Sequence, residues 1–257
     1  MRNPDAPYLE LGFYFRQRSG REALNCLTAT LLTEFNAVPK HAFATKSTSA
    51  SLFRAEEGTD CLVKTPNAND LARLLNDSSR FVKKIIVDKG TRIVRDAQEF
   101  VVVLPIESSN CEDEGNSVAI WVEGAAFSRA CSAIGSKTER KVAAKTLETF
   151  KTLISHLRPT YAAMTVDYGL ETPCDLRSDS RSLAFRDFYL SRDDFGKSFL
   201  AELKKKYPNS VYDDYEEGQI TITTAALRKA MGVESAVDDS GYDLSQFVGK
   251  NIAKILI

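Results

Sequence analysis

SKTERKVAAKTLETFKTLISHLRPTYAAMTVDY, residues 136–168, joins a long amphipathic helix directly to a strand. Ser136 and Glu139 have the spacing of a capping box, which satisfies free backbone N–H groups where a helix begins. Pro159 disfavours helical backbone at Arg158, so the helix is expected to end there. Its apolar residues recur at helical spacing and form one face, made up of Val142, Leu147, Phe150, Leu153, Ile154 and Leu157. Tyr161 to Tyr168 then predicts a strand.

Before this stretch the sequence predicts strands and helices in mixed order. Alternating or continuous apolar runs indicate strands at Tyr8–Phe15, Phe81–Val87, Phe100–Leu104 and Val118–Val122. Helical spacing indicates helices at Arg21–Phe35 and Asn69–Asp77, whereas Thr45–Ser51 is expected to be a loop or a strand with one polar face. The run Phe100–Leu104 is apolar throughout, which is typical of a strand inside a sheet.

After residue 168 the same mixture continues. Strands are expected at Ser182–Leu190 and Gly218–Thr223, and helices after Ser191, at Ala225–Met231 and at Leu244–Leu256. Because there is no regular βαβ alternation, the sequence favours an α+β fold with a mixed, largely antiparallel sheet and helices packed against it. Residues 1–257 are expected to form a single domain, with a division near residue 135 left open. The strand that contains Trp121 could pair with either half.

Composition limits the function classes. Lys and Arg number 34 against 35 Asp and Glu, so the net charge of -1 disfavours general nucleic-acid binding. No window approaches the roughly 18 apolar residues of a membrane helix, and the N-terminus shows no secretory signal. The five cysteines are dispersed, which is typical of free thiols in a reducing compartment. We therefore expect a cytoplasmic protein without membrane or nucleic-acid partners.

Catalytic motifs are missing from the sequence. The two histidines, His41 and His156, belong to no recognisable motif, and there is no phosphate loop, nucleophile elbow or metal-ligand spacing. The sequence therefore favours a binding protein over an enzyme, and no cofactor or metal is expected. An enzyme that uses Asp167, His156 or Glu171 is the alternative, because triads and carboxylate pairs are recognised by geometry and not by sequence position.

Two acidic segments are the candidate binding residues. One is Glu112, Asp113 and Glu114. The other combines four carboxylates with two tyrosines, at Tyr212, Asp213, Asp214, Tyr215, Glu216 and Glu217. Tyrosine supplies contact area with a polar group, and clustered carboxylates complement a basic partner. A solvated loop between a helix and a strand is the other interpretation of the second segment.

The order of four segments resembles the immunity-protein-52 family of bacterial polymorphic-toxin systems. These are the aromatic strand with an arginine-rich turn at Phe13–Ala23, the helix-to-strand junction at Leu157–Met164, the aromatic strand at Phe185–Ser191, and Gly218–Thr224 before a closing helix. The family's tryptophan and glycine positions near the first and late strands are not matched, and the single tryptophan, Trp121, lies elsewhere.

The resemblance implies a cytoplasmic, antitoxin-like protein that binds a cognate toxin and blocks its active site. Toxins beside such proteins look to have the restriction-endonuclease fold, and a nuclease site is usually basic because it faces a polyanion. The acidic, tyrosine-bearing segment at residues 212–217 could then mimic the charge of the substrate. A component of a phage or defence-system assembly, which would use its sheet edge or the aliphatic C-terminus Ile252–Ile257, is a further alternative. The oligomeric state is left open.

Overall fold

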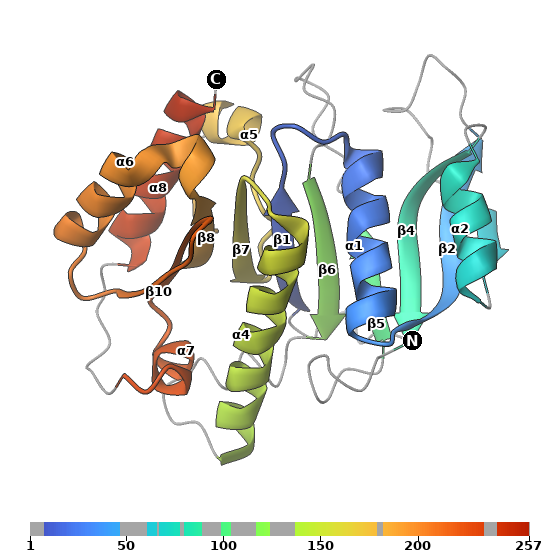
Figure 1. The fold of residues 1–257 in the computed structure, drawn as a ribbon, viewed down its shortest axis with the longest axis horizontal. Coiled ribbons are helices and arrows are strands. Elements are labelled where there is room, and N and C mark those ends of the chain that lie inside the picture. Colours follow the sequence, from blue (N-terminus) through green and yellow to red (C-terminus); the bar gives the residue numbers. More distant parts are fainter. Residues whose placement is uncertain are drawn as a thin grey trace.

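The chain folds around one ten-stranded sheet, as seen in a computed structural model that describes residues 8–46, 61–65, 67–77, 80–88, 99–103, 117–123, 137–178, 182–233 and 241–256. The strand order is β3-β2-β4-β5-β6-β1-β7-β8-β10-β9, and each described pairing is antiparallel. Helices pack against both faces (Figure 1). The expected α+β class with a largely antiparallel sheet is confirmed.

The elements have the following bounds. The strands are β1 Tyr8–Tyr14, β2 Val38–Lys46, β3 Cys61–Lys64, β4 Arg80–Asp88, β5 Glu99–Val103, β6 Ser117–Glu123, β7 Tyr161–Val166, β8 Asp187–Ser191, β9 Val211–Asp214 and β10 Gly218–Ile222. The helices are α1 Gly20–Glu34, α2 Ala68–Asn76, α4 Lys137–Leu157, α5 Pro173–Ser178, α6 Arg192–Lys206, α7 Ala225–Ala230 and α8 Gly241–Ile255.

Strand β1 lies in the middle of the sheet and joins the two halves of the chain. It pairs with β6 on one side, through Leu11 and Ile120, and with β7 on the other, through Leu11 and Met164. Strands from both sides of residue 135 therefore share one sheet. The strand of Trp121 is β6, and its neighbours β1 and β5 both come from the N-terminal half.

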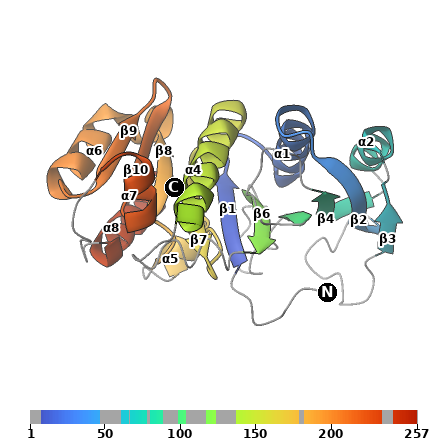
Figure 2. The same cartoon turned by 90° about the horizontal axis from the view of Figure 1, so that it is seen from below.

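Two apolar cores lie on opposite faces of the sheet (Figure 2). On one face, α1, α2 and α4 cover β1, β4 and β6, with Leu27, Phe13 and Phe150 among the fully buried side chains. On the other face, α5, α6 and α8 cover β7 and β8, with Phe188 and Leu244 at the centre. The apolar C-terminus joins this second core, because Ile252 is buried and Ile255 and Leu256 pack against it.

Arginines of the turn after β1 fix the ends of neighbouring helices. Arg18 donates to the carbonyl oxygen of Leu157 at 2.7 Å, where α4 ends. Arg21 donates to the carbonyl oxygens of Leu75 and Asp77 at the end of α2. Each bond satisfies a carbonyl that has no partner within its own helix. The arginine-rich turn is therefore part of the scaffold.

Most predicted elements are present with ends shifted by a few residues, but one strand differs more. The predicted strand Ser182–Leu190 begins only at Asp187, because residues 182–186 are irregular and end in a turn. In that turn the backbone N–H of Phe185 donates to Oγ of Ser245 on α8 instead of to a neighbouring strand. The sequence did not predict β2 along its length, β3, α5 or β9. Ser136 of the proposed capping box lies outside the described residues.

The structure bears on two expectations, that the chain has no membrane helix and that its cysteines are free thiols. In the described part of the chain, no helix combines the length and the apolar character that a membrane crossing needs. Cys26 is a free thiol, whereas Cys174 is disulfide-bonded. The expectation of free thiols throughout is therefore wrong at Cys174, since pairing depends on which cysteines the fold brings together. The cytoplasmic location stays a prediction.

Candidate protein-binding surface

The four segments that carry the family resemblance lie side by side. They contain the end of β1, most of β7 and all of β8 and β10, which are consecutive neighbours in the sheet. At the shared end of these strands, the backbone N–H of Thr160 donates to the carbonyl of Tyr14, and that of Ser191 donates to the carbonyl of Thr160. The backbone N–H of Arg192 then donates to the carbonyl of Glu217. The predicted acidic segment is thereby attached to this end of the sheet.

The acidic segment is a hairpin, not a loop. Residues 211–214 form β9, which is the outermost strand at this side of the sheet. The chain turns at residues 215–217 and returns as β10, and the N–H of Tyr215 donates to the carbonyl of Gly218 at 2.8 Å. A side chain at Gly218 would collide with the Leu190 carbonyl and the Tyr189 ring. The close approach of β10 to β8 therefore requires glycine at this position.

Tyr212 fastens the hairpin to the end of α6. Its hydroxyl lies 2.7 Å from the carbonyl oxygen of Tyr207 and 3.2 Å from that of Leu203. These carbonyls lie at the end of the helix and also accept backbone hydrogen bonds, that of Leu203 from the N–H of Tyr207 and that of Tyr207 from the N–H of Ser210. Burial raises the pKa of Tyr212 to about 12. The ring is half-buried, so this tyrosine supports the hairpin more than it offers a binding surface.

The two aspartates of β9 form ion pairs with neighbouring helices. Asp213 lies 2.5 Å from Nζ of Lys151 on α4 and accepts a hydrogen bond from the hydroxyl of Tyr215. Asp214 lies 2.6 Å from Nζ of Lys204 on α6 and accepts from Gln219. The hydrogen bonds from Lys204 and Gln219 lower the pKa of Asp214. Both carboxylates are therefore already neutralised by cations of the same chain.

The turn of the hairpin carries two exposed carboxylates that are paired less closely than the two aspartates of β9. Glu216 and Glu217 are both exposed. Glu217 lies 4.0 Å from Arg158, an exposed residue just after α4, and Arg192 donates to the carbonyl oxygen of Tyr215. Tyr215 is half-buried beside a small cavity of about 20 Å³, lined by Ile154, Ser155, Arg158, Tyr189, Tyr215 and Glu217. The surface thus combines two adjacent carboxylates of the turn with arginines of neighbouring segments.

The other acidic segment, Glu112, Asp113 and Glu114, lies outside the described residues. Its role in partner binding stays a prediction.

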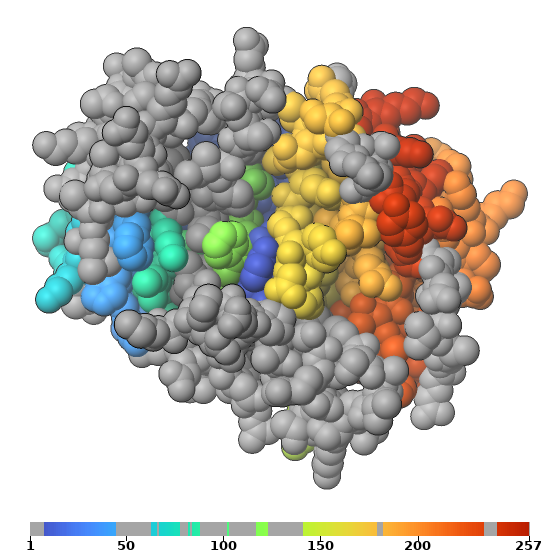
Figure 3. Space-filling view, turned by 180° about the vertical axis from the view of Figure 1, so that it is seen from behind, coloured from blue at the N-terminus to red at the C-terminus, as the bar shows by residue number. Residues whose placement is uncertain are grey.

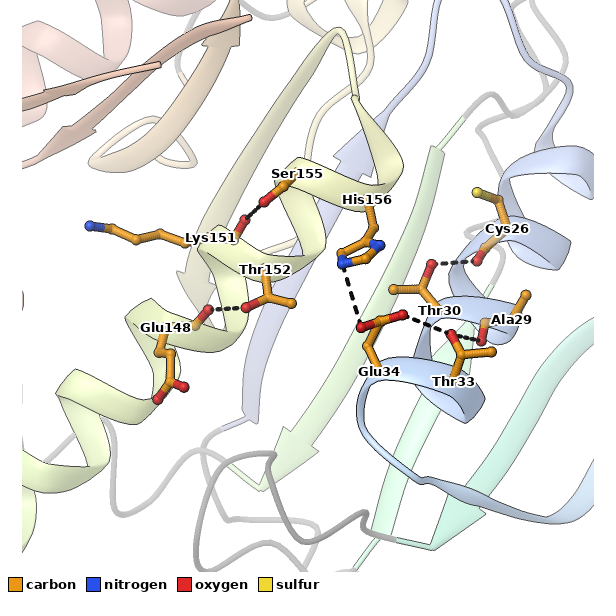
Figure 4. A network of polar contacts seen from close by, with 10 residues as sticks. All are labelled: Cys26, Ala29, Thr30, Thr33, Glu34, Glu148, Lys151, Thr152, Ser155 and His156. Atoms are coloured by element: carbon orange, nitrogen blue, oxygen red, sulfur yellow. Dashed lines mark hydrogen bonds and ion pairs between the residues drawn. The ribbon is translucent and has the colours of Figure 1, made fainter. Parts of the chain in front are cut away.

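Two residues of the enzyme alternative, His156 and Asp167, lie far apart in the structure. His156 lies on α4 and faces α1, with Nε2 3.7 Å from Oε2 of Glu34 (Figure 4). Asp167 follows β7 at its far end and accepts from the backbone N–H of Tyr8 at 2.9 Å. The strand between them covers about 20 Å at roughly 3.3 Å per residue. These two side chains therefore do not share a site.

Glu171 belongs to a return segment on the face of the sheet opposite α4. Residues 167–172 run back over β1 and β7, so that the hydroxyl of Tyr161 donates to the carbonyl oxygen of Glu171 at 2.7 Å. The carboxylate of Glu171 accepts from Oγ of Ser182. Asp167 has positive φ of 61°, which fits the sharp reversal after β7. Both acidic residues thus hold backbone segments in place.

A buried carboxylate, which sequence reasoning missed, lies under this return segment. Glu10 of β1 is only 2% exposed. It accepts from Nε1 of Trp121 at 2.5 Å and from the backbone N–H of Leu170 at 2.7 Å. Burial raises its pKa, and the two hydrogen bonds oppose that effect. The one available signal in the sequence was that Glu10 stands inside the aromatic strand 8–15. The alternation of apolar and polar residues by itself suggested that Glu10 is exposed.

No metal centre emerges from the residues that the structure covers: among them, no group of three or more His, Cys, Asp or Glu side chains could hold an ion.

Comparison with known proteins gives limited information. No protein-family model matches the chain, and no curated protein matches it. Among solved structures, the Pseudomonas aeruginosa T6SS protein PA0821 aligns over 98% of this chain and 81% of that chain, at 11% identity and with a TM-score of 0.39. A likeness of this degree carries no functional argument. Membership of the immunity-protein-52 family therefore stays a prediction.

Proposed function

We propose that the chain is an immunity protein that neutralises a cognate toxin by direct, stoichiometric binding, with the turn of the β9–β10 hairpin in the interface. The observation that carries this proposal is the exposure of Glu216 and Glu217 on a turn whose flanking residues are fixed to α4 and α6. A carboxylate pair in this position complements a basic surface, such as the active-site rim of a nuclease.

Rigidity of the hairpin supports the proposal. Tyr212 is held by backbone carbonyls, and Asp213 and Asp214 are held by lysines of two different helices. Binding through a turn that is already ordered loses less conformational entropy than binding through a flexible loop. The ion pairs also divide the acidic segment into two parts. Asp213 and Asp214 support the hairpin, and the glutamates of the turn face the partner.

The first experiment is affinity capture of the tagged chain from its native cells, followed by mass spectrometry. We expect a stoichiometric partner that carries a toxin domain. Repeated recovery of the chain alone, or of partners without toxin activity, would contradict the proposal.

The second experiment measures affinity for the captured partner at several salt concentrations. Reversal of the turn charges, Glu216→Lys with Glu217→Lys, should weaken binding about tenfold and flatten its salt dependence. Glu202→Lys, an exposed reversal on α6, is the matched control and should bind like the unmodified chain. Unchanged affinity of the double variant would remove the hairpin turn from the interface.

A further inference from the structure

The return segment 167–172 covers the part of the sheet that contains Glu10, on the side opposite α4. In Figure 3, which shows this side of the molecule, β1 is visible in dark blue between β6 in green and the yellow residues of β7 and the segments that follow it. Oε2 of Glu10 accepts a hydrogen bond from Trp121 on β6, and Oε1 accepts one from the backbone N–H of Leu170 on the return segment. One carboxyl group thus joins β1, β6 and the return segment.

The return segment lies close against β1 at Leu170. A methyl group at Gly12 would come within 2.6 Å of Cβ of Leu170 and 3.0 Å of Oε1 of Glu10. Leu170 is buried, whereas residues 167–169 just before it are exposed. The closed segment therefore removes the carboxyl group of Glu10 from water and leaves the residue 2% exposed.

The surroundings of Glu10 supply no positive charge among the described residues. On β1, β6, β7 and the return segment, the other titratable groups are carboxylic acids or tyrosines, namely Tyr8, Tyr14, Glu123, Tyr161, Asp167, Tyr168 and Glu171. A buried charge without a counter-ion costs free energy. Burial accordingly raises the pKa of Glu10, although the hydrogen bonds from Leu170 and Trp121 oppose this effect. The closed segment favours the protonated carboxyl group.

The middle of the return segment is irregular and is tied to the sheet through side chains. The hydroxyls of Thr165 and Tyr161 donate to the carbonyl oxygens of Tyr168 and Glu171, at 2.5 and 2.7 Å. The N–H of Leu170 is bound by Glu10 instead of by a strand. Irregular segments with exposed residues open at a lower cost in free energy than strands inside a sheet. Local opening of this segment is therefore the least costly way to bring water to Glu10.

We propose that Glu10 is a pH-sensitive latch, over which the return segment stays closed while the carboxyl group is protonated and opens locally as the group ionises. Opening at Leu170 hydrates the carboxylate and so removes the cost of a buried charge. It concerns none of the residues of the β9–β10 hairpin, and the inference does not depend on the proposed function.

The pH range of the latch follows from the two states of Glu10. In the open form the pKa is that of an ordinary glutamate, 4.5, and in the closed form burial raises it. Below 4.5 both forms are protonated, and the pH has no effect on opening. Between the two pKa values the open population rises with the pH, by up to about tenfold per unit for one proton. Above the pKa of the closed form it levels off.

Hydrogen exchange of single backbone amides in the full chain, followed by nuclear magnetic resonance at several pH values above 4.5, tests the latch. Glu10→Gln is the reference, because glutamine still accepts hydrogen bonds but does not ionise. Dividing the Leu170 exchange rate by the rate in this variant also removes the intrinsic effect of pH on exchange. We expect this ratio to rise with the pH by up to about tenfold per unit and then to level off.

Urea at concentrations too low to unfold the chain separates local from global opening. Exchange at Leu170 should be insensitive to urea, because a local opening exposes little surface. Phe13 is the internal control. It lies on β1 and pairs with strands on both sides, so its amide should exchange through global unfolding and accelerate as urea is added.

Two further variants complete the test. Glu202→Gln removes an exposed carboxylate of α6 and should exchange like the unmodified chain. Trp121→Phe removes one donor to the ionised carboxylate and should raise the pKa of the closed form further. The rise of Leu170 exchange should then extend to higher pH. Far-ultraviolet circular dichroism would check that each variant is folded.

Several outcomes would overturn the proposal. One is a Leu170 ratio that does not vary with pH. Another is Leu170 exchange that accelerates with urea as strongly as that of Phe13, since only global unfolding would then expose the carboxylate. An unprotected Leu170 amide below pH 4.5 would show that the segment is not closed over protonated Glu10. A Trp121→Phe profile identical to that of the unmodified chain would remove Trp121 from the latch.

Discussion

Nε1 of Trp121 donates to Oε2 of Glu10 at 2.5 Å, which places a carboxylate beneath the return segment 167–172. Burial raises the pKa of Glu10 above its ordinary value of 4.5. The folded chain therefore keeps this proton at pH values where the unfolded chain has lost it. The stability linked to protonation is fully present below the unfolded pKa and is lost as the pH rises through the folded pKa.

Glu10→Gln should remove this pH dependence, because glutamine resembles the protonated acid and does not titrate. As the pH rises from about 4 towards 7, we expect the unmodified chain to lose stability relative to the variant. The reason is that Glu10 has a raised pKa in the folded chain and loses its proton in that direction. Urea unfolding of both proteins at several pH values, followed by Trp121 emission, measures the difference. A difference that does not vary with pH would show that Glu10 has an ordinary pKa.

Gly12 allows the return segment to lie close to β1. A methyl group there would come within 2.6 Å of Cβ of Leu170. We expect Gly12→Ala to destabilise the fold by about 1–3 kcal/mol, the usual cost of overpacking. Gly169→Ala is the control, since its methyl group would meet only the Glu10 carboxylate, at an ordinary 3.9 Å. Equal unfolding free energies for the two variants would contradict the close packing of Leu170.

The hydroxyl of Tyr212 should stabilise the chain and titrate late. Tyr212→Phe removes its hydrogen bonds to the last turn of α6 and should cost about 1 kcal/mol. Because burial raises the pKa of Tyr212 from 10.0 to about 12, the stability it contributes is present below pH 10 and is lost as the pH rises through 12. Ultraviolet titration of tyrosinate should show one late-titrating group fewer in the variant. An unchanged titration curve would place the hydroxyl in solvent.

The two lysine–aspartate pairs of β9 should differ in strength. Lys151 and Asp213 have side chains 30% and 31% exposed, against 37% and 55% for Lys204 and Asp214. Exposed ion pairs contribute about 0.2–1 kcal/mol, so we expect the first pair near the upper end of that range and the second near the lower end. Double-mutant cycles with Lys151→Met, Asp213→Asn, Lys204→Met and Asp214→Asn measure both couplings. A larger coupling for the second pair would refute this order.

Elements with strong periodicity could be predicted from the sequence. Helix α4 was recognised from its apolar face and from Pro159, and β5 from its continuous apolar run; β5 indeed lies between β4 and β6. Strand β2 was missed because Pro39 interrupts it and its register shifts twice against β4. Strand β9 was missed because Asp213 and Asp214 are rare strand residues. Their lysine partners supply the stability that local preference does not.

Part of the candidate surface could likewise not be predicted from the sequence. Residues 212–217 were identified as one acidic group, but their partners come from distant elements. Lys151 precedes Asp213 by 62 residues, and no local pattern connects them. Glu10 lies 111 residues before Trp121, so the burial of this acid depends on the sheet and the return segment together. The alternation of apolar and polar residues within β1 could not show that Glu10 is buried.

The central place of β1 also matters for how the chain reaches its native state. Tyr8, at the beginning of this strand, bonds to Asp167, 159 residues further along. A ribosome releases the aromatic N-terminal strand long before β7 exists, and until then one edge of β1 has no partner. Long-range pairing of this kind slows folding and leaves apolar strand edges open to aggregation. We therefore expect the strand order itself to make unaided folding of this chain slow.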